Sequence, residues 1–564
     1  MPFASFTSRP SRRELVLIAA IVAALCATLA TLAFRVGVTV DEPSHLVSAY
    51  LYWQGNDWLK PADMPPLLKL TCGWVPRLTG LPLPPPEHDV WTTGHEWNVS
   101  QEIMHRMKAP AIRRTFGLSR LPMIVFPAAC SLLLWWWARQ LFSPAAALLV
   151  AAFFSLSPSV LGHGALVKND VAAAFAFLLF WYRVWRYAKV PTIGNAAWIG
   201  FAVGLAAITK FSLLVLVPIA PLVVAVVLWR GTALSRWVLA FAVLVLIPWL
   251  MLYLSYQCTP GRIHFTEFQV WKADPNLSVL FVKATRVAYY LWIPASYIRG
   301  LISLVQSNAS GAGVYLLGDV YPMGSALYFL VALLVKTPIA TLLAIASGLL
   351  LVIRDRGNLR LTDACWLVPP FLYLGLASLS SLQLGVRLII PALVFFLLIA
   401  GKLFESCMRR RQGQVLIAAL MVWLVTRHTA FYPHEMAFFN RLAGGPDSGL
   451  GYLSDSNLDW GQDLPQLAGY VRRHRIQKIR VAYFGSDNPW AHLGDEVMEP
   501  VAPPWSDDYI TGERYQPKPG YYAISGTLLT GQFFRPRYRD YFAEFRSRNP
   551  IAKAGYSIWI YRVE

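Results

Sequence analysis

The sequence LVLIAAIVAALCATLATLAF, residues 15–34, runs for 20 residues without a charged side chain. That is the length an α-helix needs to cross the hydrocarbon core of a bilayer. Arg9, Arg12 and Arg13 precede it, but the apolar run is too long for the core of a signal peptide and no convincing cleavage site follows. We therefore interpret this stretch as a retained first membrane span.

The composition indicates a membrane protein over most of the chain. The 564 residues are 56% hydrophobic and 14% charged, whereas a soluble domain has about 25% charged residues. The six cysteines are scattered and show no CxxC spacing, which predicts neither a zinc site nor a disulfide framework. The formal net charge of +19 lies mostly at the ends of apolar segments, so it indicates membrane topology and argues against nucleic acid as a partner.

Further apolar windows follow the first, and together they predict about eleven transmembrane helices. The windows are about 14–35, 121–141, 143–162, 171–188, 196–209, 211–229, 237–256, 325–353, 364–381, 386–403 and 414–431. If the N-terminus is cytoplasmic, every short loop on that side contains Arg or Lys, as the positive-inside rule requires. This predicts a multi-pass protein of the plasma (inner) membrane with a cytoplasmic N-terminus and an extracytoplasmic C-terminus.

The rest of the chain forms long outer segments. We expect a transmembrane domain over 1–431, with outer loops at about 36–120 and 257–324, and a soluble domain over 432–564. In the first loop, Trp97–Arg114 has the pattern of one amphipathic helix at the membrane surface. The predicted fold class is therefore mainly α, with a small C-terminal α/β domain.

The α/β prediction rests on residues 464–564 of the soluble domain. Leu464–Arg475 has the pattern of a helix. After it, the runs KIRVAYFG, YYAISG and YSIWIYRVE are rich in β-branched and aromatic residues and are bounded by Gly, Pro or Asp, which is typical of strands.

Three acidic residues are expected at the outer surface of the membrane. Asp41 and Glu42 directly follow the first span, and Asp170 lies in HGALVKND between the third and fourth spans. A carboxylate at this depth could accept a proton from a hydroxyl or bind a metal ion. Two alternatives stay open, because acids after a helix can be merely solvated and Asp170 could cap the following helix.

Three cations near the predicted spans are further candidates for the site. Lys210 lies in AAITKFSLL and Arg387 in QLGVRLIIP, each at an outer helix end, and Lys336 lies deeper, beside Pro338. Arg can donate two hydrogen bonds to a phosphate, and Lys supplies a point charge. Snorkelling to the membrane interface is the alternative for Lys210 and Arg387. Acids and cations around one outer cavity would suit group transfer from a phosphate-bearing lipid.

Several fragments together resemble a known superfamily. They are VTVDEPSHLVSA, MPPLLKL, SLSPSVLGHGALVKNDVAAAFAF, AAITKFS, YLLGDVY, LLVKTP, GVRLIIP, YPHEMAFFNRLAGGP and DSNLDWGQDL. In this order they resemble the GT-C glycosyltransferases, above all the group of protein O-mannosyltransferases and lipid A aminoarabinose transferases that use polyprenyl-phosphate sugars.

The resemblance implies roles for individual residues. The acid after the first helix is catalytic in that superfamily, which implies catalysis by Asp41 with Glu42 as its companion, and it carries over Asp170 as the second outer acid. Lys210 and Arg387 correspond to the cations that face the donor phosphate, and Lys336 is a further candidate.

The chain also departs from the pattern. Met64, preceded by Asp63, stands where relatives have His or Lys, and Asp319 stands where Glu is expected. A divalent metal ion remains an open alternative, with Asp41, Asp63 and His88 as candidate ligands.

The leading hypothesis is therefore an inverting glycosyltransferase. It would move a sugar from a polyprenyl monophosphate carrier of undecaprenyl type to a glycan, lipid or protein acceptor outside the cytoplasm. One alternative is a transporter or flippase for a lipid-linked sugar, although such proteins usually show internal repeats and charges near the membrane midplane. Another is a scaffold whose outer domain binds a partner.

Overall fold

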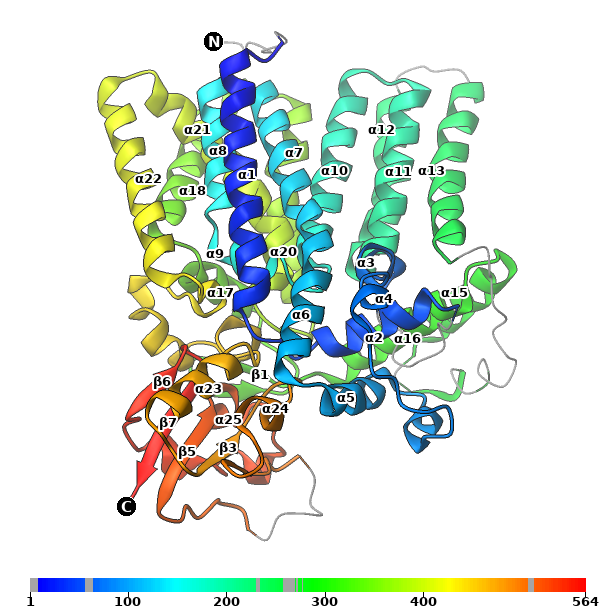
Figure 1. Ribbon diagram of the computed structural model, residues 1–564. Coiled ribbons are helices and arrows are strands. Elements are labelled where there is room, and N and C mark those ends of the chain that lie inside the picture. The colour runs from blue at the N-terminus through cyan, green and yellow to red at the C-terminus, as the bar shows by residue number, and fades with distance from the viewer. Residues whose placement is uncertain are drawn as a thin grey trace.

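The computed structural model describes residues 9–55, 64–229, 234–256, 269, 272–275, 277–505 and 512–564. Long helices form a bundle, and a domain with a small sheet lies at one end of it (Figure 1). We call this end the lower side of the bundle, because it lies at the bottom of Figure 1. Helix α1 (Arg12–Arg35) begins at the opposite, upper end, and the C-terminus lies in the lower domain.

Each of the eleven predicted windows contains helix. These helices are α1 (Arg12–Arg35), α7 (Val125–Leu141), α8 (Pro144–Ser155), α9 (Pro158–His163), α10 (Asp170–Lys189), α11 (Ile193–Thr209), η3 (Phe211–Val215), α12 (Leu216–Leu228), α13 (Leu234–Ser255), α17 (Tyr328–Lys336), α18 (Ile339–Arg354), α19 (Ala364–Leu367), α20 (Pro369–Ser378), η6 (Val386–Ile389), α21 (Ile390–Met408) and α22 (Arg411–Phe431). Within the described residues, six helical segments are long and apolar enough to cross a membrane, or seven if α17 and α18 count as one bent span. The prediction of a membrane protein with several apolar helices is thus confirmed, whereas the count of eleven transmembrane helices stays a prediction.

Helix α21 lies at the centre of the bundle. In the segment formed by η6 and α21, 89% of the most apolar window is buried inside the protein. It packs against α8, α10, α18, α20 and α22. A helix that is apolar on all sides suits this position, because every face meets another helix. Its first residues, at the lower side, are therefore held firmly in place.

Helices α17 and α18 meet at a bend of 116°. Pro338 at this break has no N–H to donate, so the end of α17 leaves carbonyl groups without helical partners. Asn440 supplies donors: its Nδ2 lies 2.6 Å from the Leu334 carbonyl and 2.9 Å from that of Thr337, and its backbone N lies 2.9 Å from that of Val335. The break therefore attaches the segment that follows α22 to the bundle.

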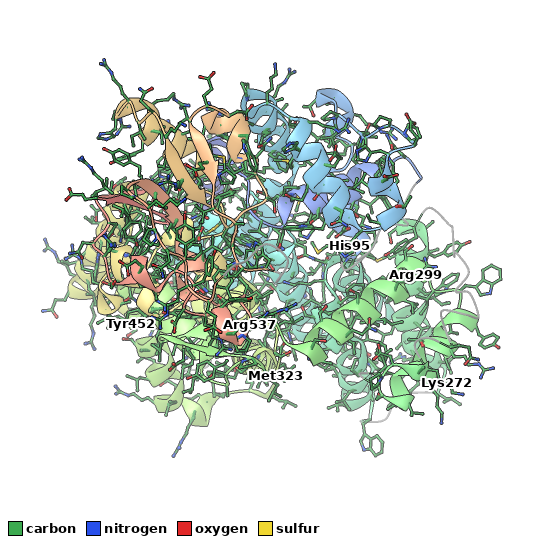
Figure 2. All side chains as sticks on the ribbon, turned by 90° about the horizontal axis from the view of Figure 1, so that it is seen from below. His95, Lys272, Arg299, Met323, Tyr452 and Arg537 are labelled. Carbon is green, nitrogen blue, oxygen red and sulfur yellow. The ribbon has the colours of Figure 1, made fainter. Side chains whose placement is uncertain are left out.

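Short helices cover the lower side of the bundle. They are α2 (Glu42–Tyr52), α3 (Pro66–Cys72), α4 (Pro76–Thr79), η1 (Asp89–Thr93), α5 (Glu96–Arg106), α6 (Ala109–Arg120), α15 (Val279–Tyr290) and α16 (Ala295–Ser310). Seen from below, Lys272 and Arg299 lie to one side, and Tyr452 and Arg537 lie to the other, where the C-terminal domain is (Figure 2).

The prediction of one helix over Trp97–Arg114 is wrong. The chain instead forms α5 and α6, with Met107 in extended conformation between them. Pro110 occupies the first turn of α6, a position that suits proline because the N–H groups there lack helical partners. The proline thus favours a new helix start within the amphipathic stretch.

The C-terminal domain contains a mixed five-stranded sheet. Its elements are α23 (Leu464–Arg473), β3 (Ile479–Ala482), α24 (Pro489–Leu493), β4 (Met498–Pro500), β5 (Gly520–Ser525), α25 (Gly526–Thr530), α26 (Ala543–Arg546), β6 (Ala552–Ala554) and β7 (Ile558–Val563). The strand order is β4-β3-β5-β7-β6. Strand β3 is parallel to β4 and β5, and β7 is antiparallel to β5 and β6. The predicted fold class, mainly α with a small α/β domain, is confirmed.

A separate two-stranded sheet precedes the bent pair. Strands β1 (Val314–Leu316) and β2 (Asp319–Tyr321) are antiparallel, and Leu316 also bridges to Leu453. The segment before α17 is therefore connected to the chain that follows α22.

Candidate active site

The segment after α1 is fixed by the chain around residue 460. The backbone N of Gly37 donates to the Gln462 carbonyl at 2.9 Å, and that of Val40 donates to the Trp460 carbonyl at 3.0 Å. A β-carbon at Gly37 would lie 2.6 Å from the Gln462 carbonyl oxygen, so only glycine permits this approach. These bonds determine where Asp41 lies.

Glu42 lies in a buried ion pair that stabilises the fold. Its carboxylate is fully buried and pairs with Arg120 at 2.6 Å. It also accepts hydrogen bonds from the backbone N–H groups of Thr39 and Val167. Burial acts to raise the pKa of Glu42, but the charge of Arg120 and these hydrogen bonds hold it below its usual range. Glu42 thus joins the start of α2 to α6, and it does not face the cluster around Asp41.

Asp41 faces two cations. Nζ of Lys168 lies 2.5 Å from Oδ2 of Asp41, and an Nη of Arg387 lies 3.6 Å from the same oxygen. The Asp41 side chain keeps 31% of its surface exposed, in contrast to 7% and 6% for the two cations. Burial acts to raise the pKa of Asp41, but Lys168 and Arg387 hold it well below its usual range. Asp41 is therefore an ionised carboxylate that solvent or a substrate can reach.

Asp170 completes the cluster from the first turn of α10. Its Oδ1 lies 2.5 Å from Nζ of Lys210, and its Oδ2 lies 3.4 Å from an Nη of Arg387. The carboxylate is 1% exposed and Arg387 is 6% exposed. Asn169, and not Asp170, is the N-cap of α10, and Arg387 points toward acids and not toward a lipid interface. The capping alternative for Asp170 and the snorkelling alternative for Arg387 are therefore wrong.

Arg387 links the two acids at the start of the central helix. Besides Asp41 and Asp170, its Nε donates to Ser456 Oγ at 3.0 Å and to the Leu384 carbonyl at 3.1 Å. Its guanidinium lies 4.3 Å from the centre of the Trp460 ring. A buried guanidinium with this many partners has a fixed orientation.

Lys336 lies in a different environment from these cations. It is 2% exposed, and its Nζ donates to the backbone carbonyls of Met436 and Asn457. It also lies 4.3 Å from the centre of the Phe439 ring. Lys336 thus holds the chain after α22 against the helix break, and this placement does not support the predicted contact with a donor phosphate.

Two of the predicted metal ligands, Asp41 and His88, lie in the described residues, and each has charged partners of its own. Asp63 lies outside the described residues, and His88 lies near Glu102, 3.6 Å away. Asp41 is surrounded by cations, which would repel a metal ion. In the part of the chain that the structure describes, no three His, Cys, Asp or Glu side chains are grouped as a metal site.

Sequence reasoning missed Lys168, Ser456 and Trp460. Lys168 pairs with Asp41, Ser456 accepts from Arg387, and Trp460 stacks near both cations. Signals for them were present, since Lys168 lies in HGALVKND and the other two lie in DSNLDWGQDL. Both motifs contributed to the resemblance, but spacing alone did not place them beside Asp41.

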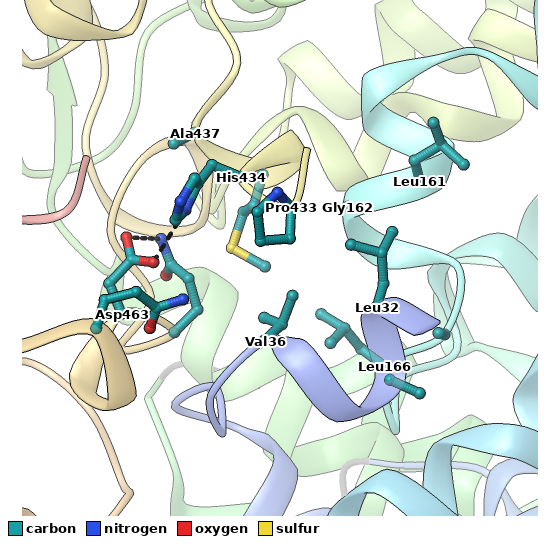
Figure 3. A pocket seen from close by; sticks show the side chains of 14 residues that line it. Leu32, Val36, Leu161, Gly162, Leu166, Pro433, His434, Ala437 and Asp463 are labelled. Atoms are coloured by element: carbon teal, nitrogen blue, oxygen red, sulfur yellow. Dashed lines mark hydrogen bonds and ion pairs between the residues drawn. The ribbon is translucent and has the colours of Figure 1, made fainter. Parts of the chain in front are cut away.

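A cavity is lined by residues from α1, from the segment around Leu161 and from the chain after α22. Figure 3 shows His434 and Asp463 on one side of this cavity, with Leu32 and Leu161 opposite them. Leu166 and Met436 also line it, and both pack with Trp460. The cavity therefore has polar side chains, His434 and Asp463, on one side and apolar side chains on the other.

The fold and the cluster define a polytopic helical membrane protein with an acid and cation site at one end of the bundle. Residues 115–253 match the family model of dolichyl-phosphate-mannose-protein mannosyltransferases. This match confirms the predicted resemblance to the GT-C superfamily, and it supports a glycosyltransferase as the class of enzyme. No protein of curated function matches the sequence.

The chain is also similar to several solved structures, three of which match over different shares of their length. ArnT from Cupriavidus metallidurans, bound to undecaprenyl phosphate, is 15% identical with a TM-score of 0.45, and the alignment covers 98% of both chains. The archaeal oligosaccharyltransferase AglB from Archaeoglobus fulgidus, in complex with an inhibitory peptide and a dolichol-phosphate, is 14% identical over 91% of this chain and 70% of its own, with a TM-score of 0.41. The S. cerevisiae protein O-mannosyltransferase complex Pmt1-Pmt2, bound to the sugar donor, is 16% identical over 45% of this chain and 35% of its own, with a TM-score of 0.32.

Proposed function

We propose that this protein is an inverting glycosyltransferase that moves a sugar from a polyprenyl monophosphate carrier to an acceptor hydroxyl on the extracytoplasmic side of the membrane. The observation that supports it best is the arrangement around Arg387, which contacts both Asp41 and Asp170 and is accompanied by Lys168 and Lys210. Acids and cations thus face one another at a single end of the bundle.

The charge of the cluster suits a lipid-linked sugar. Lys168, Lys210 and Arg387 carry three positive charges and Asp41 and Asp170 carry two negative ones, so one positive charge remains. A sugar joined to a polyprenyl monophosphate is a phosphodiester with one negative charge. Its binding would neutralise the cluster, whereas a neutral acceptor alone would not.

Asp41 is the proposed general base. It would take the proton of the acceptor hydroxyl while that oxygen forms a bond to the anomeric carbon of the sugar, and the bond from that carbon to the phosphate oxygen breaks. The acceptor attacks opposite the leaving group, which inverts the configuration. Because Asp41 is the most exposed group of the cluster, an acceptor can reach it.

The cations are proposed to stabilise the leaving group. Polyprenyl phosphate gains negative charge as the glycosidic bond breaks, and fixed cations in a partly buried site stabilise that charge without reorganising. A donor phosphate that attracts Lys168 and Arg387 would also weaken the interaction of these cations with Asp41. The pKa of Asp41 would then rise toward a value that suits a general base. Binding of the donor would thereby activate the base.

Asp170 is proposed to orient the cations. It is buried, and it contacts both Lys210 and Arg387, so it holds two positive side chains near each other that would otherwise repel. The side chains supply the positive charge that a metal ion often provides at a phosphate, and the proposed reaction therefore has no step through a metal.

The test supplies the purified protein with radiolabelled polyprenyl-phosphate sugars and membrane extracts. We expect wild-type protein to transfer label to one extract fraction, and we expect Asp41→Asn to transfer none. Absence of transfer from every donor, or undiminished transfer by Asp41→Asn, would overturn the proposal. Movement of the intact lipid-linked sugar across vesicles, with the glycosidic bond retained, would indicate the flippase alternative.

A further inference from the structure

Trp460 lies beneath the two cations that pair with Asp41. The centre of its ring is 4.3 Å from the Arg387 guanidinium and 5.2 Å from Nζ of Lys168. The indole is 2% exposed. An aromatic face attracts cations, and this attraction is strongest when the groups are shielded from water. The ring therefore offsets part of the repulsion between Arg387 and Lys168.

The two cations come from separate parts of the bundle. Lys168 precedes α10, and Arg387 lies at the start of the central helix. Their shared acid, Asp41, is the most exposed member of the cluster, so an incoming phosphate would compete with it for both cations. If the phosphate displaced the carboxylate, Trp460 would keep the two cations close to each other.

The ring itself has a fixed position. The backbone N of Trp460 donates to Gln462 Oε1 at 2.7 Å, and its carbonyl accepts from Val40 at 3.0 Å. The ring packs with Leu166 and Met436. These contacts hold the indole whether or not a ligand occupies the cluster.

The same segment connects the cluster to the C-terminal sheet. Ser456 accepts from Arg387, and three residues later the buried Asp459 accepts from the backbone N of Thr527 at 2.8 Å. Thr527 lies in α25, directly after β5. Burial raises the pKa of Asp459 to about 8, although the hydrogen bonds from Thr527 and Gly461 act in the opposite direction. Residues 455–463 thus form part of both the soluble domain and the charged cluster.

We propose that Trp460 is a positioning residue for the donor phosphate: its ring holds Arg387 and Lys168 in the geometry that binds the phosphate, so the C-terminal domain completes the active site. This inference rests on the proposed function, since it names the contact that prepares the cluster for a lipid-linked phosphate. It assigns a role to the soluble domain that the acids and cations alone do not imply.

The decisive comparison is between Trp460→Phe and Trp460→Leu. Both side chains are smaller than indole and apolar, but only Phe retains an aromatic face. We expect the Phe variant to bind radiolabelled polyprenyl phosphate within about threefold of wild type, and the Leu variant to bind it at least about tenfold more weakly. Steady-state kinetics should place the loss mainly in the KM for the donor.

Controls separate this role from a general loss of structure. Trp505 is a half-exposed indole of the same domain, and Trp505→Leu should bind polyprenyl phosphate like wild type. Equal affinities of the Phe and Leu variants would overturn the inference. If the Leu variant does not fold, Trp460→Met takes its place, because Met is likewise apolar and has no aromatic face. A donor KM equal to that of the Phe variant then overturns the inference.

The two proposals fail in different ways. If wild-type protein binds polyprenyl phosphate with the expected order of affinities among the variants but transfers no sugar, the proposed function is wrong and the positioning role of Trp460 stands. If wild-type protein transfers sugar and the Phe and Leu variants have the same donor KM, only the positioning role is wrong. Absence of any binding by wild-type protein contradicts both.

Discussion

The proposed roles of Asp41 and of the cations beside it can be distinguished by kinetic and binding measurements. In Asp41→Asn, the proposed base is lost, but Lys168 and Arg387 remain and lose a competing carboxylate. We expect kcat to fall about 10²- to 10⁴-fold, the usual contribution of a general base, with donor binding unchanged or tighter. Single-turnover assays and binding of labelled polyprenyl phosphate measure the two quantities. Asp319→Asn changes an exposed carboxylate in β2 and should alter neither, whereas parallel losses of binding and kcat in Asp41→Asn would contradict the assigned role.

Glu42 should behave differently from its neighbour. Removing one partner of a buried ion pair leaves an uncompensated charge, which costs about 3–5 kcal/mol. We therefore expect Glu42→Gln to lower the free energy of unfolding by about that amount, because Arg120 stays buried. Thermal unfolding in detergent measures the change. Glu102→Gln breaks a more exposed pair with Arg106 and should cost less than about 1 kcal/mol. A fully stable but inactive Glu42→Gln would instead favour the catalytic role that the resemblance implies.

Residue types at helix ends could be predicted from the sequence, but their partners could not. The structure brings Asp41, Asp170, Lys210 and Arg387 into one cluster. Their positions beside predicted spans indicated this meeting, since helix ends on one side of a membrane share a surface. The pairing of Glu42 with Arg120 depends on where α6 packs, 78 residues later in the chain. No local pattern carries that information.

At the scale of an element, Gly385 determines how the central helix begins. Its φ of +107° lies in the region that favours glycine, and a β-carbon there would lie 2.1 Å from Ser456 Oγ. Gly385→Ala should therefore displace η6 and with it Arg387. We expect a loss of about 1–3 kcal/mol in the free energy of unfolding and a fall in kcat/KM of about 10²-fold, as misplacement of a site by about 1 Å can produce.

The matched control lies in a neighbouring helix. Gly375 is in α20, and a β-carbon there would meet no atom within 4 Å. Gly375→Ala should be neutral or stabilise the protein by up to about 1 kcal/mol, because alanine favours helix. Thermal unfolding and donor kinetics on both variants test the difference. Equal behaviour of the two alanine variants would contradict the role given to Gly385.

Elements themselves were predictable where hydrophobicity decides them. The long helices of the bundle fall largely within the apolar windows, and β3, β5 and β7 fall largely within the three β-branched runs, because burial in lipid or in a sheet requires those patterns. The short strands β1, β2, β4 and β6 lie outside these runs. Breaks were harder to predict. Pro338 marked the bend between α17 and α18, whereas Pro110 was passed over within an amphipathic stretch that α5 and α6 share. A proline in the first turn of a helix and one inside a helix look alike in sequence.

At the scale of the whole molecule, one segment of the chain joins the C-terminal domain to the helical bundle. The chain from 455 to 463 contacts Gly37, Val40, Arg387 and Thr527. The predicted domain boundary at residue 432 stays a prediction. The sequence could not predict that residues 455–463 would be part of the charged cluster, because these contacts join segments tens to hundreds of residues apart in the chain.

The pair formed by His434 and Asp463 should make the stability of the contact between the C-terminal domain and the bundle depend on pH. Nδ1 of His434 lies 3.3 Å from Oδ1 of Asp463, whose Oδ2 accepts from the backbone N–H groups of Tyr556 and Ser557. Burial acts to lower the pKa of His434, but the hydrogen bond and charge of Asp463 outweigh it and raise the pKa. A raised pKa means that the folded protein holds the proton more tightly than the unfolded chain does.

The sign of the effect follows from this difference. The stabilisation is fully present below the pKa of an unfolded-chain histidine, about 6.5, and it is lost as the pH rises through the higher pKa of folded His434. We therefore expect Tm to fall between about pH 6 and pH 9, and we expect His434→Gln to remove that part of the slope. The measurement is thermal unfolding in detergent across this range, with His474→Gln, an exposed histidine at the end of α23, as the matched control. A histidine that binds a proton more tightly in the folded protein can only favour folding at lower pH. If His434→Gln retains the wild-type dependence of Tm on pH, the pair does not stabilise the contact between the bundle and the C-terminal domain. A Tm that rises with pH in wild-type protein but not in His434→Gln would contradict this role as well.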